Sequence, residues 1–372
     1  MGFRQGTVEG VVMLDPVFWN HKRVLLTGHT GFKGSWLLLW LRELGAQITG
    51  YSLPAEPQPN LFRQLSPQLE GSFRHIEADL ADLAALQAAV ASCQPDVVLH
   101  LAAQPLVRQS YADPLGTWTT NVVGSLHVLE ALRGLSHPCA VVMVTTDKVY
   151  ANREWAYGYR ETDRLGGHDP YSASKAAAEL DIASWRASFC GEGPHQTPHL
   201  RIATARAGNV IGGGDWAPNR IVPDAMRALA AGQPIAVRNP RATRPWQHVL
   251  EPLGGYLVLA QHLLSHNPAP CEAFNFGPTL SSNRPVAELV ETMLEHWPGR
   301  WVDTSDPSAP HEAGLLHLQV DKAHHQLGWQ PHWNYTTTLA RTVNWYRDVH
   351  VAADPYARSM EDLQAYQAAL GA

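Results

Sequence analysis

A tyrosine and a lysine, Tyr171 and Lys175, stand four residues apart at the start of an alanine-rich segment. In a helix this spacing places the two side chains on one face. There the ammonium group can lower the pKa of the phenol from its usual value of about 10, which would make the phenolate a usable base near neutral pH. Such a pair alone is more typical of an exposed helix surface, so its meaning depends on a second signal elsewhere in the chain.

The second signal is a turn with three regularly spaced glycines, Gly28, Gly31 and Gly34, between an apolar run (24–26) and a longer one (36–41). This is the pattern of a strand followed by a helix. In such a turn Gly28 would allow the tight bend, Gly31 would let the backbone approach a pyrophosphate, and Gly34 would let the helix pack closely on the strand. The peptide N–H groups at the helix N-terminus would then face the phosphates. The residues of this turn that we expect at a dinucleotide cofactor are Gly28, Thr30, Gly31, Phe32, Lys33 and Gly34.

Two further residues fall where folds of this type bind ligands. Thr146 follows a predicted strand, and Asn121 is expected to begin a helix earlier in the chain. In doubly wound sheets, ligands bind at the carboxyl ends of the parallel strands, so both side chains are candidates for the same site as Tyr171 and Lys175. Together with the glycine turn, these residues predict a hydride-transfer site.

These motifs resemble the extended short-chain dehydrogenase/reductase superfamily, and the resemblance covers nearly the whole chain from about Phe18 onward. Within that superfamily, Thr146-Asp147-Lys148 is similar to the Thr-Asp-Glu or Thr-Asp-Lys triplet of nucleotide-sugar 4,6-dehydratases. The Lys form of the triplet, the glycine turn, and the stretches at 206–216 and 244–249 resemble the branch of this family that uses CDP-glucose. The resemblance implies NAD as the cofactor, CDP-glucose as the substrate, and a homodimer or higher homo-oligomer.

The resemblance also implies a reaction, a net dehydration of the sugar. The sugar would be oxidised at C4, lose water across C5 and C6, and be reduced at C6, with the cofactor ending as it began. Tyr171 would take the proton of the 4-hydroxyl, while Lys175 supports the phenolate and Thr146 hydrogen-bonds the oxygen. The resemblance implies that Tyr171 and Lys175 also bind the cofactor. The product would be a 4-keto-6-deoxyhexose.

Asp147 and Lys148 would serve the elimination step. Asp147 is the candidate acid for the leaving 6-hydroxyl. Lys148 has two open roles: a base at C5, if its pKa is strongly lowered, or a charged group that stabilises the enolate. A surface Asp–Lys pair that merely ends a strand is the structural alternative. Extended backbone would point Asp147 away from Thr146 and Lys148, so the chain must turn here if all three share a site.

Two more segments are similar to cofactor-lining segments of the superfamily. They are Asp79-Leu80, after the third predicted strand, and Leu101-Ala102-Ala103, after the fourth. Asp79 could instead cap the helix that follows it. The second predicted strand ends without the acidic residue that usually bonds the ribose 2′-hydroxyl of NAD, so the choice of NAD over NADP rests on the resemblance.

The substrate pocket is assigned to the C-terminal half. Arg220, Arg244 and His248 stand near two tryptophans in the sequence, and we interpret them as the pocket for the diphosphate and the base. Arginine makes bidentate contacts with phosphate, which supports this interpretation. Arginines stacked on tryptophans for structural reasons are the alternative. We assign Asn121 and Asn209 to the substrate as well.

The elements that would position these residues alternate between strand and helix. Short β-branched runs predict strands, and longer amphipathic runs between them predict helices. Such alternation is typical of an α/β fold, a Rossmann-type doubly wound parallel sheet covered on both faces. The predicted strands are 23–27, 47–51, 72–77, 96–101, 140–145 and 200–205, and the predicted helices include 82–90, 121–132 and 171–185, the last two being candidates for dimer contacts.

We expect two domains. An NAD-binding domain would span 18–208, and a segment near 246–277 would return to it. A smaller C-terminal substrate-binding domain would comprise 209–245 and 278–372. Residues 1–17 would form an irregular N-terminal extension, since they show little pattern.

Composition excludes several other classes of protein. A net charge of −6 with scattered Lys and Arg provides no basic field for nucleic acid. No apolar run reaches the roughly 20 residues that cross a bilayer, so no membrane contact is expected. The four cysteines lie far apart and the histidines form no ligand pattern, which predicts no metal site and a location in the reducing cytoplasm.

Two rival functions use the same fold. A nucleotide-sugar 4-epimerase or 4-reductase would use Tyr171 and Lys175 but would not need Asp147 and Lys148 for an elimination. A non-catalytic dinucleotide sensor would have little need of the Tyr–Lys pair. The residues taken together favour the dehydratase.

Overall fold

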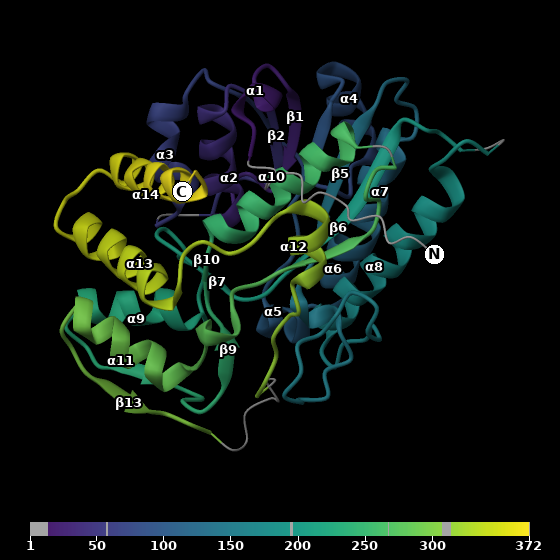
Figure 1. Ribbon diagram of the computed structural model, residues 1–372. Coiled ribbons are helices and arrows are strands. Elements are labelled where there is room, and N and C mark those ends of the chain that lie inside the picture. Colours follow the sequence, from purple (N-terminus) through teal and green to yellow (C-terminus); the bar gives the residue numbers. More distant parts are fainter. Residues whose placement is uncertain (1–13, 57–58, 194–195, 267, 307–313, 372) are drawn as a thin grey trace, which may run out of the picture.

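The computed structural model describes residues 14–56, 59–193, 196–266, 268–306 and 314–371. Its centre is a sheet of seven parallel strands in the order β11-β6-β5-β4-β1-β2-β3. Strands β1 to β6 lie side by side in the order β6-β5-β4-β1-β2-β3, which is that of a doubly wound fold. The chain starts in the middle of the sheet and adds strands outward, first on one side and then on the other. The predicted doubly wound parallel sheet is therefore confirmed (Figure 1). The strands are β1 (Arg23–Thr27), β2 (Gln47–Ser52), β3 (Arg74–Glu77), β4 (Val97–His100), β5 (Cys139–Val144), β6 (Leu200–Ala207) and β11 (Ala273–Phe276).

Helices cover both faces of this sheet. Alternate residues of a strand point to opposite faces, so Val141 joins one apolar cluster while Val142 joins the other. The central strands β4 and β5 are buried throughout, which explains why their sequences are nearly continuous apolar runs. One face is covered by α4 (Leu83–Cys93), α7 (Gly124–Leu132) and α8 (Pro170–Phe189), and the other by α2 (Phe32–Glu43), α3 (Leu61–Leu69) and α10 (Leu250–Ser265).

The start of α4 decides between two readings of Asp79. The helix is capped by Asp82, whose Oδ1 accepts a hydrogen bond from the Ala85 N–H at 2.9 Å. Asp79 bonds the Ala81 N–H in the preceding turn, also at 2.9 Å. The alternative that Asp79 caps this helix is therefore wrong.

The prediction that Asn121 begins a helix is also wrong. The helix starts with α6 (Pro114–Trp118), where Asp113 accepts a hydrogen bond from the Gly116 N–H at 2.9 Å and proline occupies the first turn. It passes through a five-residue π-helical turn, η1 (Thr119–Val123), and continues as α7. Asn121 thus lies inside a π turn, an irregularity frequently found at functional sites.

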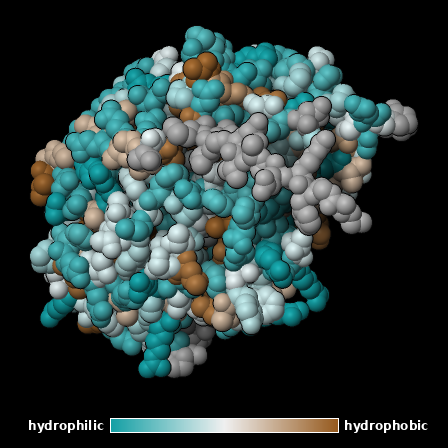
Figure 2. Space-filling view, in the orientation of Figure 1, coloured by the Kyte–Doolittle hydropathy of each residue, from teal (hydrophilic) through white to brown (hydrophobic). Residues whose placement is uncertain are grey.

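Much of the chain after β6 builds a smaller lobe, which lies below the sheet in the view of Figure 1. Figure 2 shows the same side of the molecule, whose surface is mostly hydrophilic with scattered hydrophobic residues. Three small pairings hold the lobe together: β7 with β10, β9 with β12, and β8 with β13. Their bounds are β7 (Val210–Ile211), β8 (Ile235–Val237), β9 (Thr243–Pro245), β10 (Gln247–His248), β12 (Asn283–Pro285) and β13 (Trp301–Asp303), and the lobe's helices are α9 (Ile221–Ala230), α11 (Val286–His296) and α13 (Tyr335–His350).

Two later segments return to the sheet domain. After α10, strand β11 pairs in parallel with β6 and extends the sheet, with α12 (Asp321–Leu327) beside it. Helix α14 (Pro355–Leu370) packs back on α2, where the rings of Tyr366 and Trp40 lie 5.6 Å apart. The segment 278–372, expected to bind substrate, therefore ends in a helix on the cofactor domain.

Short elements complete the described chain: α1 (Pro16–Trp19), α5 (Val107–Ala112), and the 3-10 turns η2 (Asp147–Val149) and η3 (Leu280–Ser282). Residues 1–13 of the predicted N-terminal extension lie outside the described residues, whereas Asp15 caps α1. Among the residues that the structure describes, no helix is long and apolar enough to cross a membrane.

Candidate active site

A cavity of about 1250 Å³ runs along the carboxyl ends of β1, β4 and β5 and continues into the C-terminal lobe. Doubly wound folds bind their ligands at this edge of the sheet. All of the glycine turn residues expected at the cofactor line it, as do Asp79, Leu80 and the segment 101–103. The predicted catalytic residues and Asn209, Arg220 and Arg244 line it too.

The glycine turn is shaped by contacts that no side chain would permit. Gly28 has φ +76°, and a Cβ there would stand 2.7 Å from the backbone nitrogen of Ala102. A Cβ on Gly34 would overlap the carbonyl oxygen of Gly28. Gly31 caps α2 without a side-chain hydrogen bond, so the first N–H groups of the helix face the cavity. The turn therefore offers an anion site made of backbone.

The end of β2 forms another part of the cavity wall at the glycine turn. Thr30 Oγ1 lies 2.7 Å from Ser52 Oγ and ties the glycine turn to that strand end. Within residues 51–80, the described residues that line the cavity include Glu56 and Asp79 but no lysine or arginine. The carboxylates of Glu56 and Asp79 would repel a negatively charged group bound at this part of the cavity wall.

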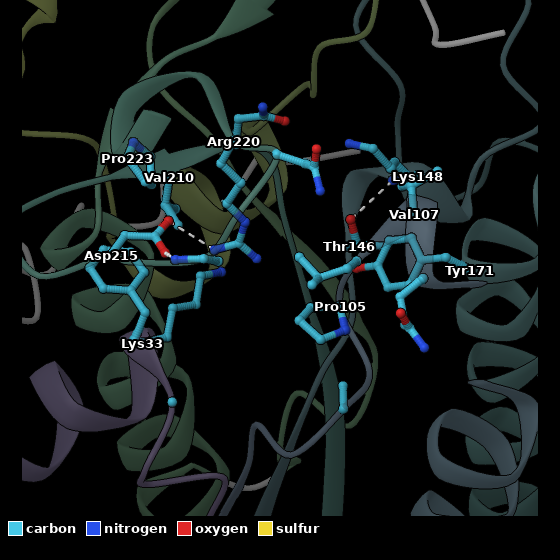
Figure 3. Close-up of a pocket in the computed structure, with 18 of the residues that line it drawn as sticks. Lys33, Pro105, Val107, Thr146, Lys148, Tyr171, Val210, Asp215, Arg220 and Pro223 are labelled. Atoms are coloured by element: carbon cyan, nitrogen blue, oxygen red, sulfur yellow. Dashed lines mark hydrogen bonds and ion pairs between the residues drawn. The ribbon is translucent and has the colours of Figure 1, made fainter. Parts of the chain in front are cut away.

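The catalytic candidates gather where β5 ends. After Thr146 the chain turns into η2, so that Thr146, Asp147 and Lys148 all reach the cavity. The Thr146 hydroxyl donates to Asp147 Oδ1 at 3.0 Å and also hydrogen-bonds the Tyr171 phenol. Figure 3 shows that phenol pointing into the cavity, with Thr146 and Lys148 beside it. Thr146 therefore bridges the candidate base and the candidate acid.

Asp147 is almost fully enclosed, with 1% of its surface exposed. Its Oδ1 lies 3.6 Å from the Lys148 ammonium, whose side chain is 27% exposed. Its Oδ2 has no hydrogen-bond partner among the described residues. A buried carboxylate oxygen without a partner is costly, which makes Asp147 a candidate functional residue.

Tyr171 and Lys175 do not show the pKa relation expected from the sequence. Burial raises the pKa of Tyr171 to about 12, against the opposing effect of the Thr146 hydrogen bond and with help from the charge of Asp147. Burial also lowers the pKa of Lys175 to about 8, although Glu179 opposes it. The Lys175 amine donates to the Val144 carbonyl at 3.3 Å instead of to the phenol. Loss of water from around the phenolate thus outweighs any effect of the ammonium on the pKa of Tyr171.

Glu179 is a functional candidate that sequence reasoning missed. It lies one helical turn beyond Lys175 on α8 and is buried. Arg206 on β6 donates to both of its oxygens, at 2.9 and 2.8 Å, and Thr145 and Thr204 donate as well. The repeated four-residue spacing from Tyr171 through Lys175 to Glu179 was the available signal.

Arginines mark the opposite wall of the cavity. Arg220 pairs with Asp215 at 2.9 Å, and both line the cavity together with Trp216, Trp246 and Arg244. Asp215, like Glu179, had no role in the sequence-based assignment. Its spacing to Arg220 in one loop was the signal for the pair.

Two residues assigned to the substrate lie elsewhere. Asn121 is buried and accepts from the Gln104 N–H at 2.9 Å while donating to Ser174 Oγ at 2.9 Å, because the π turn aims it at α8. His248 is buried between Trp36 and Trp333, and burial lowers its pKa to about 3. Neither residue lines the cavity in the part of the chain that the structure describes.

Comparisons with known proteins agree with this geometry. The family model of GDP-mannose 4,6-dehydratase matches residues 25–342. A CDP-glucose 4,6-dehydratase of Salmonella typhimurium is 44% identical over 96% of this chain and 99% of its own length. A dTDP-glucose 4,6-dehydratase of Xanthomonas campestris is 27% identical over 87% of this chain and 92% of its own.

Solved structures share the fold. A dTDP-glucose 4,6-dehydratase from Streptomyces venezuelae, solved with NAD, has a TM-score of 0.75 at 23% identity and covers 90% of this chain and 99% of that one. A UDP-glucose 4-epimerase from Stenotrophomonas maltophila, also solved with NAD, reaches 0.77 at 22% identity and covers 90% and 100%. The fold alone therefore does not separate dehydratase from epimerase, whereas the family model and the sequence relatives do. The chain belongs to the GDP-mannose 4,6-dehydratase family of nucleotide-sugar hydro-lyases.

Proposed function

We propose that the protein converts CDP-glucose into CDP-4-dehydro-6-deoxyglucose with NAD as its cofactor. The 44% identity to a CDP-glucose 4,6-dehydratase supports the choice of substrate. The observation that carries the reaction type is Asp147, whose unpartnered Oδ2 is enclosed in the same cavity as the Tyr171 phenol. An epimerase or reductase would have no use for an acid there.

The site fits a dinucleotide. The backbone N–H groups at Gly31 and the start of α2 suit a pyrophosphate. Among the described residues, a Cβ on Gly31 would meet only the Gly28 oxygen within 4 Å, at 3.4 Å, so the space beside Gly31 is open. Glu56 and Asp79 would repel the 2′-phosphate of NADP, which supports NAD. We assign to the cofactor Gly28, Thr30, Gly31, Phe32, the backbone of Lys33, Gly34, Asp79, Leu80, Leu101, Ala102 and Ala103.

Bound NAD supplies the hydride acceptor for C4 and the hydride donor for C6. The chain's own residues move the protons. The proton of the 4-hydroxyl passes to Tyr171 while Lys175 supplies positive charge nearby. Asp147 protonates the leaving 6-hydroxyl, and water departs. In the net reaction the 4-hydroxyl proton leaves with that water, so the bridge from Tyr171 through Thr146 to Asp147 offers a short path for it. Lys148 would act at C5, either as the base that removes its proton or as the charged group that stabilises the enolate.

The oligomeric state that we propose is a homodimer or a higher homo-oligomer. Helices α6 and α8 pack side by side and expose Leu115 and Leu180, with 77% and 61% of their surfaces accessible, near the half-exposed Trp118. Exposed apolar side chains on adjacent helices are typical of a subunit contact. All four cysteines are free thiols, which supports a reducing compartment such as the cytoplasm.

A substrate panel tests the proposal. Purified protein with NAD is incubated separately with CDP-, dTDP-, UDP- and GDP-glucose, and loss of one water is followed by mass spectrometry. We expect loss from CDP-glucose, and deuterium placed at C4 should appear at C6 of the product. Inversion at C4 without water loss would replace the proposal with the epimerase.

A further inference from the structure

Lys33 is a partly buried cation in the cavity wall, without a counter-charge among the described residues. Its side chain leaves the glycine turn and donates a hydrogen bond to the Tyr256 hydroxyl at 3.3 Å. Tyr256 is buried on α10, and the Lys33 amine lies 5.7 Å from the centre of its ring. Across the described ranges, no carboxylate lies within ion-pair distance of this amine. Lys33 is partly buried, and because such a cation keeps only part of its hydration, an anion from outside the chain would stabilise it.

Arg220 shares this part of the cavity. Figure 3 shows the Lys33 side chain extended toward the Arg220 guanidinium, on the side of the cavity opposite Tyr171. Asp215 neutralises Arg220 but contacts no second cation within ion-pair distance in the described chain. Asp215 therefore does not compensate the charge of Lys33.

The surroundings make Lys33 easy to deprotonate. Burial, followed by the charge of Arg220, lowers the pKa of Lys33 to about 7, with Lys175 acting in the same direction and Asp147 against it. Among the described residues, the other titratable groups that face this region include Tyr256 on α10, Tyr171, and Asp215 beside Arg220. An anion placed next to the amine would raise its pKa again, because the charged form would gain a partner.

We propose that Lys33 and Arg220 jointly bind the diphosphate of the nucleotide sugar, and that Lys33 takes up a proton as this diphosphate arrives. The inference rests on the proposed substrate class. A cofactor pyrophosphate has the same chemistry, but the groups suited to it are the N–H groups of the glycine turn, whereas the Lys33 amine lies beside Tyr256 and faces Arg220. A sugar with C4 at Tyr171 would then direct its phosphate toward the opposite wall.

Calorimetry on the full chain, freed of cofactor so that no turnover occurs, separates these sources. CDP-glucose is titrated at pH 8 in two buffers of different ionisation enthalpy, because its diphosphate has no group that titrates there. The wild type should take up about one proton per CDP-glucose, since a group with a pKa of about 7 is mostly neutral at this pH, and much less at pH 6. Lys33→Met should abolish the uptake and weaken CDP-glucose binding about tenfold or more, the scale of a lost charged hydrogen bond.

A second titration, with NAD, provides the comparison. Lys33→Met should change NAD affinity by less than about threefold, well under a lost charged contact. The matched control is Lys22→Met, which removes a cation that lies over Phe18 and not in the cavity, and should leave both titrations unchanged. Loss of NAD affinity with CDP-glucose binding intact, or proton uptake that persists in Lys33→Met, would overturn the assignment. If the wild type binds another nucleoside diphosphate sugar and not CDP-glucose, the proposed substrate is wrong. The role of Lys33 is then tested by the same two titrations, with that sugar in place of CDP-glucose.

Discussion

The two ends of the cavity are built from different material. At the cofactor end the shape comes from backbone: Gly28 and Gly34 allow contacts that a Cβ would prevent, and helix N–H groups supply the polarity. At the substrate end it comes from long charged side chains, Lys33 and Arg220, whose placement depends on Tyr256 and Asp215. A backbone site demands particular residues at fixed spacing, whereas a side-chain site demands only that distant residues aim at one point. We therefore expect substitutions in the backbone site to abolish binding, and substitutions in the side-chain site to change its affinity by smaller steps.

The largest effect is expected from Gly28→Ala. The new Cβ would stand 2.7 Å from the Ala102 nitrogen, on a residue with φ +76°. We expect NAD binding to fall below detection in a fluorescence titration. Gly232→Ala is the matched control, because it shares the positive φ of +65° but has nothing within 4 Å, and it should lose only about 1 kcal/mol of stability. Equal behaviour of the two variants would mean that backbone strain, not close approach, explains the glycine.

Asp147→Asn should have the next largest effect. The amide keeps the size of the side chain but cannot protonate the 6-hydroxyl, so the elimination should slow by about 10²- to 10⁴-fold. Oxidation at C4 should slow much less, because Tyr171 and Lys175 are untouched. Single-turnover absorbance at 340 nm would show reduced cofactor accumulating. Equal slowing of both steps would remove Asp147 from the acid role.

Glu179→Gln should change the pH profile. Lys175 must be charged to assist Tyr171, so activity should fall as pH rises through its pKa of about 8. Glu179 raises that pKa, and its removal should move the falling limb to lower pH, with about a fivefold loss at pH 8 for a shift of about one unit. The profile of kcat against pH measures this shift.

Two further variants serve as controls for the shift of the pH profile. Thr204→Val removes a hydrogen bond to Glu179 without changing charge, so its limb should stay in place. The double variant Glu179→Gln with Arg206→Gln avoids an unpaired buried arginine, which is itself strongly destabilising. If the folded double variant keeps the wild-type limb, Glu179 acts only as a structural clamp.

The smallest catalytic effect is expected at Asn121. Its amide links Gln104 to Ser174 and does not reach the cavity in the described structure. Asn121→Ala should therefore lower the free energy of unfolding by about 1–3 kcal/mol while changing KM by less than about twofold. Urea denaturation and steady-state kinetics check the two halves. A large rise in KM with unchanged stability would restore the substrate role first assigned to this residue.

The contrast between features built from backbone and features built from side chains also explains which parts of the fold and site could be predicted from the sequence. The parallel sheet and its strands β1 to β6 could be predicted from strand periodicity and the glycine spacing, because each depends on local pattern. Asn121 and His248 were misplaced because their side-chain directions depend on a π turn and on packing between Trp36 and Trp333. The pKa of Tyr171 was misjudged because burial, which sequence does not reveal, outweighed its neighbour.

Helix α14 has a consequence for biosynthesis. Its Tyr366 hydrogen-bonds Glu251 of α10 at 2.8 Å and packs against Trp40 of α2, so it fastens helices that flank the cofactor turn. A ribosome translates α14 only after all the described strands have emerged. The nascent chain can therefore form its sheet early, but α2 and α10 gain this brace only once residues 355–370 are clear of the exit tunnel.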